Sequence, residues 1–207
     1  MPRLRRLCSN RVSLLPNRSI KQLCIRGEPL ADWLNGFFEG LPEINGSPIH
    51  LDIRPQLTAY RDTLLSGQPE RGTAVHAGSF IRDRRIVLET ELLDQPDNFR
   101  LILTHELFHF VWTRLGTPKR RQFQDLLETE IGRRAVGEIG ESAAHAKQQL
   151  GPLDSQQRSI RWRNYVCESF CDTAARCYAG VDTHLYFRLA GRWQRARFLL
   201  LHSYAPF

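Results

Sequence analysis

The chain has 207 residues, of which 42% are hydrophobic and 25% are charged, and its formal net charge is +7. This balance is typical of a globular protein with one large domain, and it excludes a low-complexity or fibrous chain. The sequence contains no run of about 18 apolar residues, so we expect no membrane-spanning helix and no membrane partner.

Residues 1–27 show little hydrophobic periodicity, and we interpret them as a partly disordered N-terminal extension ahead of a single domain formed by residues 28–207. The basic start, residues 1–8, is not followed by an apolar core, which argues against a secretory signal. The five cysteines are an odd number without such a signal, which favours a reducing compartment over a disulfide framework. We therefore expect a cytoplasmic protein.

The positive charge comes mainly from arginines that are scattered along the chain. A basic surface can favour an acidic partner or nucleic acid. No long basic run or nucleic-acid-binding motif accompanies the charge, so a solvated surface is the favoured interpretation. Composition does not determine the oligomeric state.

The first half of the chain shows the patterns of short helices and strands. Apolar residues at helical spacing predict a helix over 29–40. Alternation of apolar and polar residues over 49–53 predicts a strand, and the segment 57–65 is interpreted as a short helix. Two runs rich in β-branched and aromatic residues, 79–82 and 85–92, flank a polar pair and predict a β-hairpin.

The second half is predicted to be helical. Asp and Pro within 94–97 favour a helix start, and we expect this helix to run to about Leu115. Further helices are expected within 119–150, 161–178 and 183–202. Strands ahead of helices along the chain predict an α+β fold class.

The motif His105-Glu106-Leu107-Phe108-His109 lies inside the first of these helices and has the form H-E-x-x-H. Residues four apart share one face of a helix, so the imidazoles of His105 and His109 can bind one metal ion. Glu106 lies one step round the helix, where its carboxylate can take a proton from a water activated by the ion. Histidines are costly to bury without partners, so the apolar residues around the motif favour a metal site over histidines that only hydrogen-bond in a core.

A catalytic zinc site needs a third protein ligand and one open position. Glu168 and Asp172 are four apart in a segment that is helical in pattern, so they share one face. Glu168 can supply an oxygen to the metal, and Asp172 can accept a hydrogen bond from the second nitrogen of a ligand histidine. We therefore expect His105, His109 and Glu168 as metal ligands, with Asp172 as a hydrogen-bond acceptor that orients one of the ligand histidines.

Other residues compete for the position of third ligand. The acids between the two motifs, and one histidine that is a strong rival because His₃ sites are common, are Glu128, Glu130, Glu138, Glu141 and His145. Cys167 and Cys171 could bind a soft metal, but packing among apolar neighbours is the favoured interpretation.

The pairing of His105-Glu106-x-x-His109 with Glu168-x-x-x-Asp172 resembles the gluzincin group of zinc metallopeptidases. Gly78-Ser79-Phe80, followed by residues 85–88 and by the motif helix, adds a likeness to small zincin domains, including the ImmA/IrrE-like peptidases. The resemblance implies a zincin-like domain in which a small mixed or antiparallel sheet packs on the motif helix. It also implies one Zn²⁺ per chain, a peptide or protein substrate, and Glu106 as the general base.

Two features of this expected mechanism stay open. The strand 85–92, if it lies at the sheet edge, could hold an extended peptide by backbone pairing. The developing oxyanion normally needs a donor beside the metal, and the candidates in the second half are Tyr165, Tyr178, His184, Tyr186, Arg188, His202 and Tyr204.

The function expected from these residues is that of a zinc-dependent peptidase. Two other functions are compatible with the same sequence. One is a non-catalytic regulatory protein that uses a zincin fold to bind an acidic partner or nucleic acid, and the other is a zinc hydrolase of a non-peptide bond.

Overall fold

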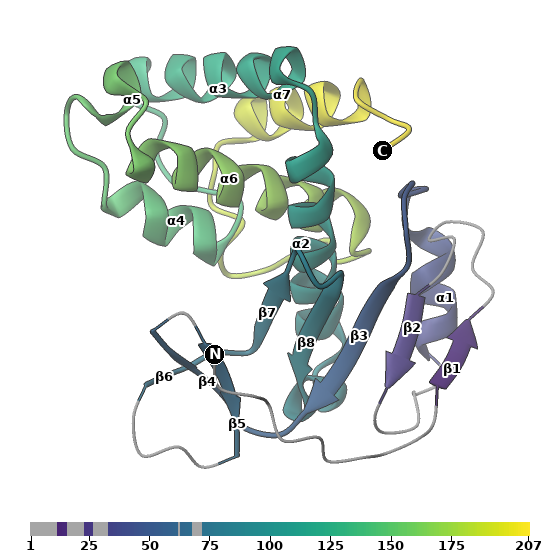
Figure 1. Cartoon of the computed structure of the whole chain (residues 1–207). Coiled ribbons are helices and arrows are strands. Elements are labelled where there is room, and N and C mark those ends of the chain that lie inside the picture. The colour runs from purple at the N-terminus through teal and green to yellow at the C-terminus, as the bar shows by residue number, and fades with distance from the viewer. Residues whose placement is uncertain (1–11, 16–22, 27–32, 62, 68–71) are drawn as a thin grey trace.

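The computed structural model describes residues 12–15, 23–26, 33–61, 63–67 and 72–207. This part of the chain forms an α+β fold, as the sequence predicted, with strands in the first half and most helices in the second. Figure 1 shows the strands in the lower part of the molecule and the helices of the second half above them, with α2 extending through both.

The main sheet is mixed and has the strand order β1-β2-β3-β8-β7. Its interior pairs, β2 with β3 and β3 with β8, are parallel, whereas the outer pairs are antiparallel. In spatial order the strands are β1 (Val12–Leu15), β2 (Leu23–Arg26), β3 (Ile49–Arg54), β8 (Arg85–Glu89) and β7 (Ala77–Phe80).

Two features of this sheet differ from the expectation. Strands β1 and β2 lie within residues 1–27, where the sequence shows little periodicity, and the rest of that expected extension lies outside the described residues. The second difference concerns the edge. Strand β8 is an interior strand because β3 pairs with one side of it and β7 with the other, so β7 is the edge strand beside the motif helix.

A second, three-stranded antiparallel sheet has the order β5-β4-β6. The helix predicted over 57–65 is wrong, because this segment forms β4 (Leu57–Tyr60) and β5 (Thr63–Ser66). Arg61 has a left-handed φ of 52° at the turn between the two strands, which ends any helical run there. A nine-residue segment has little helical stability of its own, so cross-strand pairing decides its structure. Strand β6 (Thr73–Ala74) pairs with the other side of β4.

Helix α2 (Pro96–Arg114) follows a 3₁₀ turn, η1 (Thr90–Asp94), and carries the H-E-x-x-H motif. Pro96 occupies the first turn, where its missing N–H costs nothing. The helix packs against β7 and β8 on one side and against α6 on the other (Figure 1). It is therefore buried along most of its length, and its motif lies between a sheet edge and a helix.

The described residues form six further helices. They are α1 (Trp33–Gly40), α3 (Thr117–Gly132), α4 (Glu141–Gln148), α5 (Asp154–Gln157), α6 (Ile160–Tyr178) and α7 (Gly191–His202). Of these, α3, α4, α5 and α7 all contact α6. The helix predicted over 183–202 begins only at Gly191, and the preceding residues form an irregular segment with a short turn. No helix formed by the described residues is both long and apolar enough to cross a membrane.

The core lies where α2, α6 and the sheet meet. Phe108 of α2 packs against Phe170 of α6 at a ring-centroid distance of 6.0 Å, and Phe123 of α3 meets the same ring at 5.4 Å. Leu51 and Leu88 of the sheet are fully buried in the same cluster. Because this apolar packing fixes α2 against α6, the polar faces of the two helices are also held in a defined register.

Candidate metal centre

Helices α2 and α6 bring the four residues of the two motifs into one cluster. His105 Nε2 lies 3.1 Å from Glu168 Oε2, and the rings of His105 and His109 stand edge to face at a centroid distance of 4.9 Å. Asp172 lies behind His105, one helical turn from Glu168. The predicted ligands and their predicted supporting acid are thus brought together from two helices.

The donor atoms of this cluster have a spacing that suits a single metal ion. In the described part of the chain, two overlapping groups have ligand atoms within 4.8 Å of one another: His105, His109 and Cys171, and His109, Cys167 and Glu168. Nitrogen and oxygen ligands at zinc bond lengths lie roughly 3.3 Å apart in a tetrahedral site. The 3.1 Å separation of His105 Nε2 and Glu168 Oε2 fits this requirement. Each donor group includes a cysteine, and neither holds His105, His109 and Glu168 together, so the residues present fit a bound metal cation with the cysteine thiols among the possible donors.

Asp172 fixes the orientation of His105. Its Oδ1 lies 2.7 Å from His105 Nδ1, so the Nε2 atom of the same ring is left to face Glu168. Its Oδ2 accepts a hydrogen bond of 2.8 Å from the backbone N–H of Ala143, near the start of α4. A Cβ added at Gly140 would lie 2.2 Å from the Asp172 carboxylate, so only glycine allows this approach of loop to acid. Sequence reasoning missed Gly140 and Ala143 because neither carries a reactive side chain.

The electrostatics around His105 favour positive charge. Burial opposes protonation of this imidazole, but the Asp172 carboxylate and a hydrogen bond to Glu168 outweigh burial and raise the pKa of His105 well above 6.5. Burial likewise disfavours the ionised form of Glu168, yet its contact with His105 lowers the pKa of this carboxyl below 4.5. The cluster therefore stabilises a cation between its carboxylates.

His109 has sulfur partners on its Nδ1 side. The Sγ atoms of Cys167 and Cys171 each lie 3.5 Å from His109 Nδ1. The hydrogen bond from Cys171, together with that of His109, lowers the pKa of Cys167 to about 6 against the opposing effect of burial. Cys171 is fully buried, and burial raises its pKa well above 9.0. Both cysteines pack with the apolar core, as expected. Their contacts with His109 were not predicted, although the four-residue spacing of Cys167 and Cys171 on the helix of Glu168 was a signal for them.

Glu106 is held by the edge strand. The hydroxyl of Ser79 on β7 donates a 2.5 Å hydrogen bond to Glu106 Oε2 and also lies 3.1 Å from the backbone oxygen of Glu106. The carboxylate of Glu106 is therefore positioned by a residue 27 places earlier in the chain. The contact of Ser79 with Glu106 follows only from the packing of β7 on α2.

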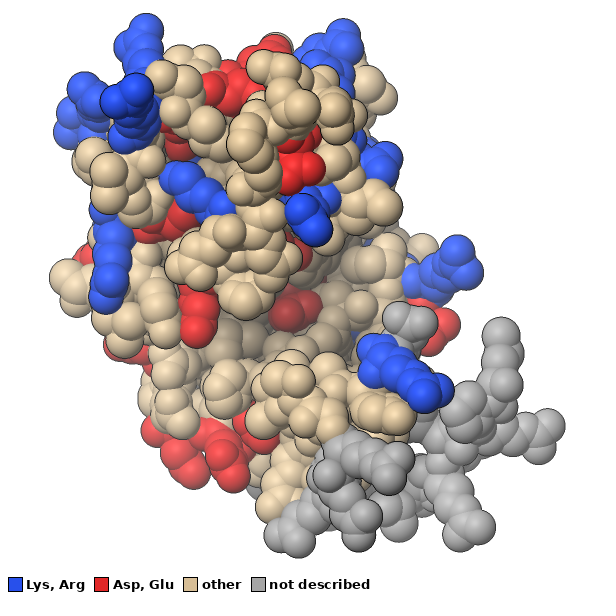
Figure 2. Space-filling view, turned by 90° about the vertical axis from the view of Figure 1, so that its left-hand side faces the viewer, with Lys and Arg blue, Asp and Glu red and all other residues tan. Residues whose placement is uncertain are grey.

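A cavity of about 400 Å³ opens beside His105 and Glu106. Its walls combine apolar side chains of α2 with Val75 and Ala77 near the edge strand and with the irregular segment 184–187. Figure 2 shows the molecule hollowed between its helical part and its strands, with acidic side chains inside the hollow and most Lys and Arg around the helical part.

Two of the seven oxyanion candidates, His184 and Tyr186, line this cavity. Tyr186 donates a 3.1 Å hydrogen bond to Glu141 Oε1, and its ring lies 5.5 Å from that of His184. The other five are not among the lining residues. For example, Tyr165 donates to Glu138 in the interior, and Tyr204 donates to the backbone of Lys119.

The competing third ligands have other partners or lie outside the two donor groups. Glu130 and Glu138 both bind the guanidinium of Arg197, and Glu141 accepts from Tyr186. His145 is exposed and pairs with Gln149. Among the described residues, neither donor group includes any of these four, nor Glu128.

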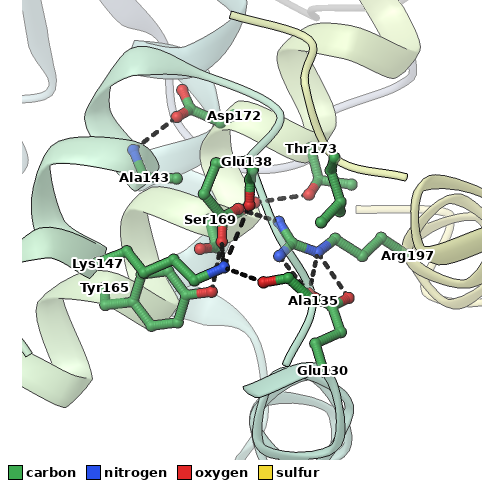
Figure 3. A network of polar contacts seen from close by, with 12 residues as sticks. Glu130, Ala135, Glu138, Ala143, Lys147, Tyr165, Ser169, Asp172, Thr173 and Arg197 are labelled. Carbon is green, nitrogen blue, oxygen red and sulfur yellow. Dashed lines mark hydrogen bonds and ion pairs between the residues drawn. The ribbon is translucent and has the colours of Figure 1, made fainter. Parts of the chain in front are cut away.

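A buried polar network holds Glu138, which lies two residues before Gly140 (Figure 3). Arg197 of α7 is fully buried and donates to Glu130 at 2.5 Å and to Glu138 at 2.8 Å. Glu138 also receives hydrogen bonds from Tyr165 at 2.6 Å and lies 2.9 Å from Lys147 Nζ. Burial disfavours the charge on Glu138, but Arg197 outweighs it and lowers the pKa of this carboxyl. The network thus joins α3, α4, α6 and α7 through Glu138 and Arg197.

Comparisons of the chain with protein-family models, curated proteins and solved structures found no match. The side chains of the site form a group of histidine, carboxylate and thiol donors that can bind a metal ion, next to a second carboxylate and a cavity.

Proposed function

We propose that this protein is a zinc-dependent peptidase of the gluzincin type. One observation carries the proposal: His105 Nε2 and Glu168 Oε2 meet at 3.1 Å beside His109, while Glu106, next in sequence to His105, faces the adjoining cavity. Two histidines and one carboxylate are a donor set used by catalytic zinc sites, which leave a fourth position for the reaction. The zincin-like fold belongs to the same proposal.

Zinc, when bound by His105, His109 and Glu168, supplies a Lewis acid that polarises a carbonyl and makes a water molecule more acidic. Glu106 accepts the proton of that water as general base and delivers it to the leaving amine. The Ser79 hydroxyl, at 2.5 Å, holds the Glu106 carboxylate in position for both transfers. His184 and Tyr186 line the same cavity and are the donors we propose for the carbonyl oxygen.

A peptide substrate is favoured by the position of β7. Among the described strands β7 pairs only with β8, and it lies against the helix that carries Glu106. An extended peptide that adds to a sheet edge gains backbone hydrogen bonds along its length. Ser79 belongs to this strand, so a peptide paired there would pass close to the proposed base. The partly apolar cavity would accept an adjacent side chain.

The proposed function is tested with wild type and Glu106→Gln, each freed of metal and reloaded with Zn²⁺. We expect about one zinc per chain in both proteins. We also expect the wild type to cleave an unfolded protein or a peptide library, as read by mass spectrometry, and the variant to lose activity by at least about 100-fold. Glu91→Gln, a change at an exposed acid that does not line the cavity, is the matched control and should keep most of the activity.

Equal cleavage by wild type and Glu106→Gln would contradict the mechanism. Zinc binding without cleavage of any peptide would favour a non-peptide substrate or a binding protein that does not turn over.

A further inference from the structure

We propose that Cys167 and Cys171 position the metal ligand His109 by accepting a hydrogen bond from its Nδ1–H, so that its Nε2 faces the metal. This inference rests on the proposed zinc site. Both Sγ atoms lie 3.5 Å from His109 Nδ1, a normal separation for an N–H group and sulfur. The thiol pair would serve His109 as Asp172 serves His105.

The orientation of His105 indicates which nitrogen of His109 is available to the metal. Asp172 engages Nδ1 of His105, and Nε2 of that ring faces Glu168. A metal ion at Glu168 is therefore bound through His105 Nε2. The sulfur atoms engage the same Nδ1 position of His109, which leaves Nε2 as its metal-binding atom. The two ring nitrogens of an imidazole point in diverging directions, so groups that bind Nδ1 lie on the side of the ring away from the metal.

The contact between His109 and the two sulfur atoms is partly buried, so its loss should affect metal binding. His109 is only partly exposed and Cys171 is fully buried, so water cannot readily replace a lost sulfur partner. A ligand histidine whose other nitrogen lacks a partner rotates more freely and binds the metal more weakly. The zinc affinity of the site should therefore depend on Cys167 and Cys171 although neither is a ligand.

The test compares zinc dissociation constants, measured by competition with a chelator, across matched variants. Cys167→Val, Cys171→Val and the double variant remove the acceptors with little change in volume. We expect a loss of about 10- to 100-fold in zinc affinity, largest for the double variant. Cys167→Asn supplies a carbonyl oxygen at the half-buried position and should recover much of the affinity. Cys177→Val changes a half-buried thiol of the same helix that does not contact His109, and it should bind zinc as the wild type does.

Cobalt substitution separates positioning from direct ligation. The Co²⁺ protein should lack a thiolate-to-metal charge-transfer band, because the sulfur atoms stay outside the ligand set. Such a band in the wild type, lost in Cys167→Val or Cys171→Val, would overturn the proposal by making a thiolate a ligand. Unchanged zinc affinity in the double valine variant would also overturn it. Peptide cleavage is measured separately, so a protein that binds zinc but cleaves nothing would refute the proposed function without touching this inference.

Discussion

The carboxylate of Asp172 and the imidazole of His105 meet at 2.7 Å, although 67 positions separate them in the sequence. The contact joins α2 to α6 and selects the nitrogen of His105 that faces Glu168. It also reaches α4, because the other oxygen of Asp172 accepts from Ala143. Replacing Asp172 should therefore disturb metal binding without removing a ligand.

We expect Asp172→Ala to lower zinc affinity about 10- to 100-fold, since the freed His105 ring loses its fixed orientation. A chelator-competition titration measures the change. Asp182→Ala is the control, because Asp182 is fully exposed and its ion pair with Arg176 is a long one of 4.0 Å. Wild-type affinity in Asp172→Ala would show that this contact does not support a ligand.

Glu168→Ala tests the third ligand directly. Removing its oxygen from a site of two histidines and one carboxylate should abolish stoichiometric zinc binding at micromolar metal, as read by metal analysis after gel filtration. Glu141→Ala, at the exposed rim of the cavity, should keep about one zinc per chain. If Glu168→Ala keeps its zinc, a thiol or another acid must take the position.

Ser79→Ala should impair cleavage but spare the metal. The hydroxyl donates to Glu106 at 2.5 Å, and a hydrogen bond to a charged group contributes about 1.5–3 kcal/mol. We expect kcat/KM to fall about tenfold or more, with zinc affinity unchanged. Ser142→Ala, at an exposed serine that lines the same cavity, is the control. A parallel loss of zinc would mean that Ser79 supports the fold of the site instead of its base.

Gly140→Ala should destabilise the protein and weaken the site together. The added Cβ would lie 2.2 Å from the Asp172 carboxylate, which must move and lose its bond to Ala143. Overpacking of this kind costs about 1–3 kcal/mol of unfolding free energy. Gly132→Ala is the matched control, because no atom lies within 4 Å of a Cβ there. Denaturant unfolding and zinc titration should both report the change in Gly140→Ala only.

Glu138→Gln should change the dependence of stability on pH. Arg197 lowers the pKa of Glu138 in the folded protein below the value of 4.5 expected when unfolded. The unfolded state therefore takes up a proton first on acidification. The stabilisation is complete above pH 4.5 and is lost as the pH falls from 4.5 through the folded pKa.

At neutral pH, Glu138→Gln leaves buried Arg197 with one carboxylate, and breaking such a pair costs about 3 kcal/mol. Unfolding free energies measured at neutral pH and below pH 4.5 should differ less in this variant than in the wild type. Asp125→Asn, at an exposed acid of α3, should keep the wild-type dependence. An unchanged profile in Glu138→Gln would place the acid sensitivity elsewhere.

Local patterns predicted the parts of the fold in which short-range physics dominates. The helix of the H-E-x-x-H motif, the helix of Glu168 and the hairpin of β7 and β8 form close to their predicted positions. The helix predicted over 57–65 was wrong because a short apolar run is compatible with either a helix or a strand. The pairing of β4 with β5 and β6 decided in favour of strands. The predicted start of the last helix at residue 183 was wrong, because residues 184–187 line the cavity and the helix begins at Gly191.

The sequence by itself determined which chemical groups the site contains. Helical periodicity places His105 and His109 on one face of α2, and Glu168 and Asp172 on one face of α6, whatever the rest of the chain does. Tertiary structure decided which groups meet. The packing of α2 on α6 sets the 3.1 Å contact of His105 with Glu168 and gives His109 its sulfur partners. The rival acids Glu130, Glu138 and Glu141 have other partners. Contacts between distant segments depend on how whole faces of helices and sheets bury their apolar surface, and the spacing of residues along the chain does not predict which faces pack together.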